Sequence, residues 1–411
     1  MRGVVWLTLL FSVAVVAALT LGRNDGLVSL FWGGWRIDLS LNLFLVVVVA
    51  GCMLMFLALH AMRSLLTLPT KAKAWRQAQR ERGAQSLLRE ALVHLWGGRY
   101  ARAQRSVHRL LSLQESTGEA SPDRGALALA HLLAAEAAHR LQDRVQRQHQ
   151  WDAALREALD GEQRDAARLQ AVGWALEDRD ANRALGLLGE LPPGTARRSH
   201  AMRLRLQAAR LSGQTLDALR SARLLTKHQA FAPGIGQSLV RSLALEWLDA
   251  ARDADQLRQA WVQLEHAERR DPYVVARVAL RSVVHGAIAD ARLYLRPCWD
   301  EMRQLSDEER AAVALATLAS LEGLGVDWLA RLESACQAFP RDPHVGLVMA
   351  HALAELQLWG KAKQHLTTAA ADLRLSADLR RRTWLRLADM AEHAGSVDER
   401  LAAIEQAARV N

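Results

Sequence analysis

The side chains with the clearest binding chemistry are arginines and histidines that recur at helical spacing in two parts of the chain. Residues three or four apart lie on one face of a helix. Seven residues hold such places, counted back from turns at Gln142 and Gly213: Glu136, His139, Arg140, His200, Arg203, Gln207 and Arg210. A guanidinium group binds a carboxylate through two parallel hydrogen bonds. A groove lined by these seven residues would therefore suit an acidic peptide segment or the propionates of a porphyrin. The chain has 48 Arg and 5 Lys, so an ordinary arginine-rich helix surface explains the same spacing, and we favour that interpretation.

Catalytic motifs give little support for an enzyme. The sequence has no Walker A motif, no HExxH and no GxSxG, and Gly234-Ile235-Gly236 has Leu239 where a dinucleotide-binding motif needs a third glycine. The cysteines Cys52, Cys298 and Cys336 form no CxxC pair, which argues against a zinc site or a disulfide framework. We expect no catalytic residue, no metal and no cofactor.

Two uncharged stretches near the N-terminus predict membrane spans, because a helix needs about 20 apolar residues to cross a bilayer. They cover residues 4–21 and 39–59, and residues 22–38 form a short outer loop between them. The first stretch could instead be a cleaved signal peptide, although Arg2 is the only basic residue before it. We expect an uncleaved anchor, and residues 1–62 then form a membrane hairpin.

A basic segment, residues 63–83, follows the second stretch. Its cations are Arg63, Lys71, Lys73, Arg76, Arg80 and Arg82. Such residues attract anionic lipid and mark the cytoplasmic side of a bacterial inner membrane. The sequence pI near 10.1 would suit nucleic acid, but the excess charge stands beside a membrane segment, so we expect a lipid partner and no nucleic-acid partner.

The outer loop contains Phe31-Trp32-Gly33-Gly34-Trp35. This pattern predicts a tight glycine turn between two short extended pieces, with the indole rings at the membrane interface. A platform for a tetrapyrrole is the alternative. The loop is short for that role and has no histidine ligand.

Residues 84–411 read as paired amphipathic helices with small residues at recurring places. We expect an all-α fold in which two N-terminal transmembrane helices lead into a TPR-like α-solenoid with a concave groove. The spacing implies eight or nine units, with degenerate ones near 165–195, 237–270 and 307–340. Asp-Pro at residues 271–272 and 342–343 marks two helix starts. The turns between paired helices are predicted at residues 98, 142, 213, 286, 357 and 395.

The layout resembles the HemY-type inner-membrane proteins of proteobacteria. The matching elements are the two spans, the basic stretch, ALVHLWGGRYARAQR, and HLLAAEAAHRLQDRVQRQHQWDAALREA from His131 to Ala158. The resemblance implies an association with late haem biosynthesis and supplies no catalytic residues. It does not extend to the unrelated flavin-dependent oxidase that shares the name.

Three functions remain open at this point. The favoured one is a membrane-anchored scaffold that organises haem-biosynthesis enzymes at the cytoplasmic face of the inner membrane through protein–protein contacts. The second is a carrier or sensor that binds porphyrin or haem directly. The third is a repeat adaptor for another cell-envelope process.

Overall fold

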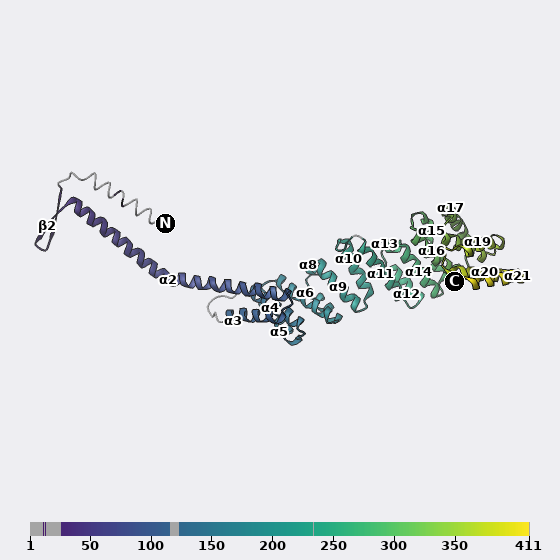
Figure 1. Cartoon of the computed structure of the whole chain (residues 1–411), viewed down its shortest axis with the longest axis horizontal. Helices are drawn as coiled ribbons and strands as arrows, with labels where there is room; N and C mark the ends of the chain where they lie inside the picture. The colour runs from purple at the N-terminus through teal and green to yellow at the C-terminus, as the bar shows by residue number, and fades with distance from the viewer. Residues whose placement is uncertain (1–10, 12, 14–25, 116–122, 233, 411) are drawn as a thin grey trace. The chain divides into compact units, whose positions relative to one another are not determined.

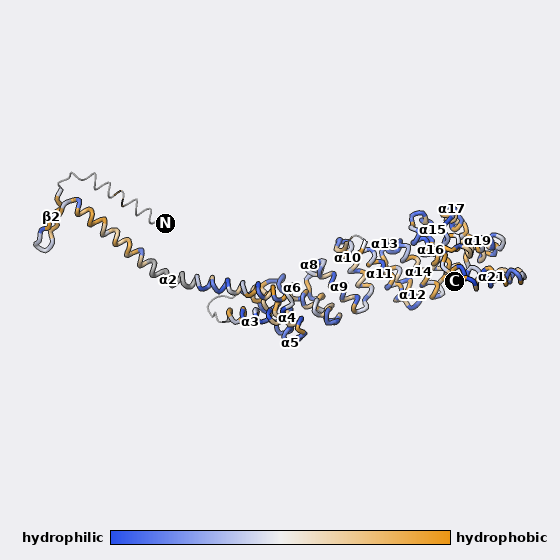
Figure 2. Tube along the Cα trace, viewed as in Figure 1, coloured by the Kyte–Doolittle hydropathy of each residue, from blue (hydrophilic) through white to orange (hydrophobic). Residues whose placement is uncertain are grey.

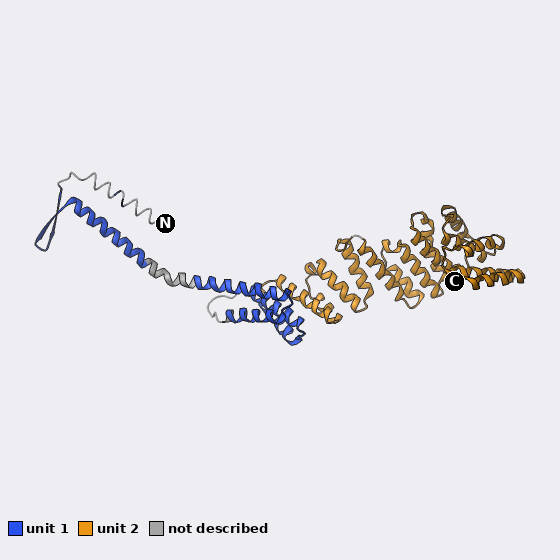
Figure 3. Ribbon diagram, in the orientation of Figure 1, with its two compact units in different colours: residues 1–157 blue, residues 158–411 orange. Residues whose placement is uncertain are grey.

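The computed structural model describes residues 11, 13, 26–115, 123–232 and 234–410, with the backbone alone for residues 63–74 (Figure 1). The predicted first span, 4–21, lies outside the described residues apart from residues 11 and 13. The chain is mostly helical (78%) and divides into two compact units, residues 1–157 and 158–411 (Figure 3). This division falls inside the single array that the sequence predicts from residue 84.

Unit 1 begins with a β-hairpin in the predicted outer loop. Strand β1 (Leu27–Trp32) pairs antiparallel with β2 (Trp35–Ser40), with Trp32 opposite Trp35. Gly33 and Gly34 have φ values of 59° and 94°, a conformation that glycine adopts without a Cβ clash. The predicted glycine turn is therefore confirmed, and the all-α description needs this small sheet added to it.

Helix α2 (Leu41–Trp96) joins the β-hairpin to the repeats of unit 1 without a break. The Ser40 side chain caps it by accepting a hydrogen bond from the Leu43 backbone N–H. Its first part, Leu41–Met62, is the one candidate span found among the described residues, against a predicted span of 39–59. Figure 2 shows this part apolar and, further along α2, hydrophilic residues mixed with hydrophobic ones. No helix boundary falls at residue 62 or 83, where the sequence divides the domains.

The rest of unit 1 consists of two helical hairpins. The end of α2 packs on α3 (Tyr100–Glu115), and α4 (Arg124–Arg140) packs on α5 (Arg144–Glu157). Their shared core has small and large apolar residues in alternation: Ala91, Val107, Leu110, Ala130, Leu133 and Ala134. Alanine lets two helix axes approach closely, and the larger side chains fill the spaces that remain.

The described residues of unit 2 form seven further pairs of consecutive helices. The pairs are α6 (Gly161–Glu177) with α7 (Ala181–Gly189), α9 (Ser199–Leu211) with α10 (Thr215–Lys227), α11 (Ile235–Asp249) with α12 (Ala254–Val262), α14 (Pro272–Val284) with α15 (Ile288–Asp300), α16 (Asp307–Ala319) with α17 (Leu329–Ala338), α18 (Pro343–Glu355) with α19 (Trp359–Ala371), and α20 (Ala377–His393) with α21 (Val397–Arg409).

Short helical turns separate some of these pairs and make the repeat spacing irregular. They are α8 (Pro193–Ala196), α13 (His266–Arg269), η1 (Met302–Gln304) and η2 (Val326–Trp328). Two of the predicted degenerate units contain helix pairs that pack on each other, α6–α7 and α11–α12. In the third, α16 and α17 both pack on α18. With two hairpins in unit 1, the structure agrees with the predicted eight or nine units. Both predicted Asp-Pro helix starts are confirmed, at α14 and α18.

All six predicted turn residues adopt the left-handed conformation. Their φ values lie between 58° and 74°, and they are Gly98, Gln142, Gly213, Gly286, Gln357 and Gly395. The residue after each turn closes the same backbone bond, as when Asp143 N–H donates to the Ala138 carbonyl and Gln214 N–H to that of Ala209. One type of helix stop therefore recurs along the array, whether glycine or glutamine occupies it.

Candidate functional site

Helix α9 presents four of the predicted groove residues on one exposed face. His200, Arg203, Gln207 and Arg210 are all exposed, and the buried side of the same helix carries Ala201, Met202, Leu206 and Ala209 among others. Each residue of the exposed row is three or four positions from the next, so the row follows one face of the helix. The α9 face, defined here as these four residues, lies wholly within unit 2.

The four residues differ in how far the fold already uses them. Arg203 donates to the backbone carbonyl of Ala230, in the segment before α11. The side chains of His200, Gln207 and Arg210 make no hydrogen bond or ion pair within the described part of the chain. A cation in this state can bind an external carboxylate without giving up an internal partner.

The other three predicted groove residues lie on α4 in unit 1, and one of them is buried. His139 is 3% exposed, so the prediction that it lines an open groove is wrong. Arg147 of α5 donates to its Nδ1 over 2.7 Å. Because arginine can only donate, Nδ1 is the acceptor, and the proton of the neutral ring is on Nε2. Arg140 is exposed and pairs with Glu136 over 2.6 Å on its own helix.

A second polar pair joins the same two helices. His131 of α4 and Gln150 of α5 are 2.7 Å apart through Nδ1 and Oε1, and Gln150 is also 3% exposed. The amide oxygen accepts, so the histidine donates. The polar residues of the block that carries the family resemblance therefore hold α4 to α5, and their conspicuous sequence reflects folding.

The sequence contains a signal for this buried pair. Five residues after the turns at 98, 213, 286 and 357, a buried alanine begins the packing of the second helix: Ala103, Ala218, Ala291 and Ala362. Arg147 holds that place after Gln142. A long cation that is buried at this place needs partners inside the hairpin, and the His139 ring is one of them.

Further along unit 2, consecutive first helices are joined by arginine–carboxylate pairs. Arg277 of α14 grips Asp249 of α11 with two bonds of 2.6 and 2.7 Å. Asp271 and Asp342 cap α14 and α18 and also accept from Arg241 (2.6 Å) and Arg310 (3.0 Å). Many of the arginines behind the high pI are therefore part of the fold, which contrasts with the α9 face.

Burial suppresses the chemistry of two cysteines and a histidine. It raises the pKa of Cys298 to about 12 and that of Cys336 to about 11, so both stay thiols, which are poor nucleophiles. Burial and then the nearby Arg386 charge lower the pKa of His351 to about 4, and its Nε2 lies 3.2 Å from Thr383 Oγ1. Among the described residues, no three metal-ligating side chains converge. None of these groups is set up for nucleophilic or acid–base work at neutral pH.

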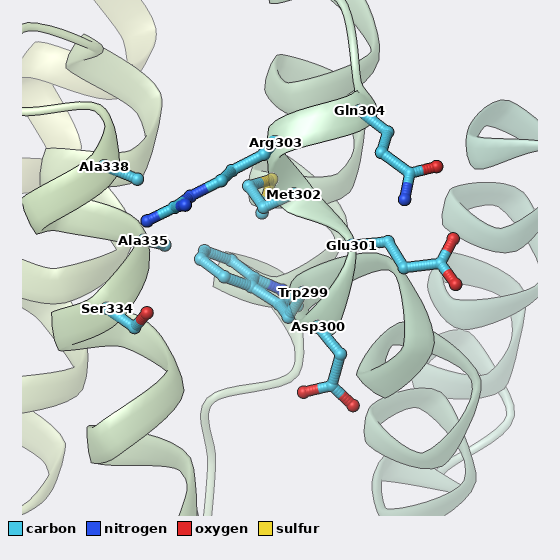
Figure 4. A pocket seen from close by; sticks show the side chains of 9 residues that line it. All are labelled: Trp299, Asp300, Glu301, Met302, Arg303, Gln304, Ser334, Ala335 and Ala338. Atoms are coloured by element: carbon cyan, nitrogen blue, oxygen red, sulfur yellow. The ribbon is translucent and has the colours of Figure 1, made fainter.

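Unit 2 has a small depression of about 340 Å³ between the end of α15 and α17. Figure 4 shows Arg303 reaching toward Ala335 and Ala338, while Asp300 and Glu301 extend from the other side of Trp299. Two carboxylates against one guanidinium group make this depression a poor match for the propionates of a porphyrin.

The predicted lipid-facing cations all lie along α2. Arg76, Arg80 and Arg82 are exposed, and residues 63, 71 and 73 fall where only the helix backbone is described. Since α2 is continuous, their distance from the apolar part is set by the rise of the helix.

Comparison with known proteins supports the HemY-type resemblance for the N-terminal part of the chain. The family model described as "HemY protein N-terminus" matches residues 26–142, which include the β-hairpin, α2, α3 and α4. The search of the curated proteins found no match.

Two solved structures are similar in a limited way. "Crystal structure of APC/C hetero-tetramer Cut9-Hcn1" has 14% identity and a TM-score of 0.29 over 80% of this chain and 66% of that one. "Structure of Naa15/Naa10 bound to HypK-THB" has 13% identity and a TM-score of 0.25 over 77% and 56%. The chain thus spans about two thirds or less of these neighbours, and its repeat fold is established by its own hairpins and turns. Residues 26–142 therefore match the N-terminal region of the HemY protein family, as the sequence resemblance predicts.

Proposed function

We propose that the chain is a membrane-anchored scaffold that holds enzymes of late haem biosynthesis at the cytoplasmic face of the inner membrane. The observation that carries this proposal is the unbroken helix α2, whose apolar part Leu41–Met62 continues into the first helix of the first repeat. A continuous helix of this kind tethers a binding surface to the membrane and raises the local concentration of its clients. The HemY-type N-terminal region supports the link to haem biosynthesis.

The proposed orientation rests on charge. The basic cluster after Met62 puts the repeats in the cytoplasm by the positive-inside rule, and the uncharged residues 4–21 then supply a second span. Measured along α2, Lys71 and Lys73 lie about 14–17 Å beyond the apolar part, and Arg80 and Arg82 about 27–30 Å beyond it. With screening over about 8 Å, the two lysines interact more strongly with anionic headgroups than the two arginines.

The α9 face is the proposed client contact. His200, Gln207 and Arg210 are exposed and keep their hydrogen-bonding capacity for an external group, in contrast to the paired arginines of α14 and α16. An acidic segment of a client enzyme fits this face, because each carboxylate finds a donor without breaking an internal bond.

Photo-crosslinking in cells tests this proposal. A photo-reactive amino acid replaces Gln207 in the full-length chain, and the matched control carries it at Leu224 of α10, an exposed residue of the same hairpin. We expect Gln207 to capture ferrochelatase, protoporphyrinogen oxidase or a uroporphyrinogen-pathway enzyme, with little capture at Leu224. Capture of envelope-assembly proteins alone would favour the adaptor alternative and contradict the haem role.

A haemin titration separates the scaffold from a porphyrin carrier. The scaffold predicts an unchanged Soret spectrum when haemin meets the full-length chain in detergent. A shift that disappears in His200→Ala would favour direct binding at the α9 face. His139 is a poor candidate ligand, since it is buried and bonded to Arg147.

A further inference from the structure

The β-hairpin before α2 has two faces of opposite character. Residues paired across an antiparallel ladder point to the same side of it. One side therefore carries apolar side chains alone, from the pairs Val28 with Leu39, Leu30 with Ile37, and Trp32 with Trp35. We call these six residues the apolar face.

The opposite side holds a polar network. Ser29 and Asp38 are directly paired and hydrogen-bonded, and Arg36 donates to Asp38 over 3.0 Å. The Arg36 guanidinium also lies 5.7 Å from the centre of the Phe31 ring. The hydrogen bonds from Ser29 and then from Arg36 lower the pKa of the Asp38 carboxyl, so this side stays charged. It is suited to contact with water.

The apolar face is exposed in the described part of the chain. Trp32 and Trp35 are 85% and 78% exposed, and Ile37 is 52% exposed. An isolated two-stranded hairpin is at most marginally stable in water, and it needs an apolar surface to pack on. The hairpin therefore requires a neighbour that covers these six residues.

The junction with α2 identifies that neighbour. Ser40 ends β2 and also caps α2, and the Leu41 backbone N–H donates to the Gly26 carbonyl at the base of the hairpin, 2.9 Å away. The apolar helix begins at Leu41, so the hairpin base is fixed at the boundary of the bilayer. Both outer strand edges carry unpaired backbone groups, which hydrocarbon cannot satisfy and headgroups and water can. Tryptophan prefers the same depth.

We propose that this hairpin is an interfacial anchor that lies along the membrane surface, with its apolar face in the headgroup–acyl boundary and its Ser29–Arg36–Asp38 side in water. It would fix the depth and rotation of α2 from the side opposite the repeats. Its partner is the lipid surface itself, and the inference does not depend on what the repeats bind.

Site-directed spin labelling of the full chain in vesicles of phosphatidylethanolamine and phosphatidylglycerol tests it. The native cysteines are replaced by alanine, and single labels are placed through Leu30→Cys and Ile37→Cys on the apolar face and Ser29→Cys and Arg36→Cys on the other. Met55→Cys, in the apolar part of α2, and Val93→Cys, near its end, give lipid and water references. Collisions with oxygen report lipid, and collisions with a water-soluble nickel chelate report water.

We expect the oxygen-to-nickel collision ratio to alternate along the hairpin, with residues 30 and 37 near the Met55 reference and residues 29 and 36 near the Val93 reference. Equal nickel access at all four positions would overturn the proposal, because the hairpin would then stand in water. Protection of residues 30 and 37 from both reagents would also overturn it. That result would mean a protein cover, either residues 4–21 of the chain or a membrane partner.

Discussion

Helices α4 and α9 have the same place in their hairpins, yet their polar residues have different roles. Each is a first helix that stops at a left-handed residue, Gln142 in one and Gly213 in the other. Three positions before that residue, α4 has His139 at 3% exposure and α9 has Arg210 exposed to solvent. The position relative to the turn therefore determines which face of the helix a residue is on, but it does not determine whether that face is exposed to solvent.

The second helix of each hairpin accounts for the difference. Five residues past the turn, α10 has Ala218, which is fully buried, and α5 has Arg147. The alanine side chain needs no hydrogen-bond partner from the first helix, so Arg210 can point outward to solvent. The buried guanidinium group requires an acceptor and takes the His139 ring. One substitution in the partner helix thus turns a potential binding residue into a structural one.

Loss of the buried pair is expected to have the largest effect. Arg147→Ala removes the hydrogen bond to His139 Nδ1 and creates a cavity, so α4–α5 should lose about 3 kcal/mol of local stability. Hydrogen exchange of full-length protein, read on peptides from α4 and α5, measures this loss. Arg210→Ala, the counterpart on α9, should change local stability by less than about 0.5 kcal/mol. Equal effects would show that the two helices do not differ as described.

The buried His351 should make the stability of the chain depend on pH. His351 has a folded pKa of about 4 against 6.5 in the unfolded chain, so the unfolded state binds the extra proton between these values. The contribution of the buried, neutral His351 to the free energy of unfolding is complete above pH 6.5. It is lost as the pH falls toward 4, a change of up to about 3 kcal/mol.

Denaturation of wild type and His351→Gln across this pH range measures that contribution, since other titrating groups cancel in the difference. The variant should lose part of the acid sensitivity of the wild type. Parallel curves for wild type and His351→Gln would contradict the buried, neutral state of His351.

Free and paired arginines should contribute unequally to the binding of an acidic ligand. Arg210→Gln removes an uncommitted donor, whereas Arg277→Gln removes one already paired with Asp249. We expect Arg210→Gln to weaken binding of a fluorescent oligoglutamate peptide about two- to five-fold and Arg277→Gln to leave it nearly unchanged. Fluorescence anisotropy gives both affinities. A larger loss for Arg277→Gln would place the acidic contact away from α9.

The smallest predicted effect concerns the turns themselves. Gln142 has a φ of 60°, a conformation that costs a residue with a Cβ about 1 kcal/mol. Gln142→Gly should therefore stabilise α4–α5 by about 0.5 kcal/mol after the entropy that glycine loses on folding. The reverse change, Gly213→Gln, should destabilise α9–α10 by a similar amount. Hydrogen exchange of the two hairpins reports both, and a loss of stability in Gln142→Gly would mean that the glutamine side chain has a role of its own.

Local patterns made much of the fold predictable. The six turn residues, the two Asp-Pro helix starts and the glycine turn at Gly33 follow from backbone preferences that act over a few residues. The uncharged stretch after Leu39 predicted the candidate span Leu41–Met62 to within a few residues, because a spanning helix excludes charge along its length. The candidate site was harder to predict. Spacing placed His200 and Arg210 correctly on one exposed face and failed for His139.

What the sequence determined by itself was the identity of the elements and the positions of their ends, since those depend on neighbouring residues. What the tertiary structure decided was which arginines are available to bind an external ligand. In the sequence, nothing distinguishes Arg210 from Arg277, Arg310 and Arg147. In the fold, each of the last three is hydrogen-bonded to a carboxylate or a ring eight to thirty-two residues away. The physical reason is that a guanidinium group near or within a packed interface must be paired, and its partner comes from whichever helix the fold brings against it.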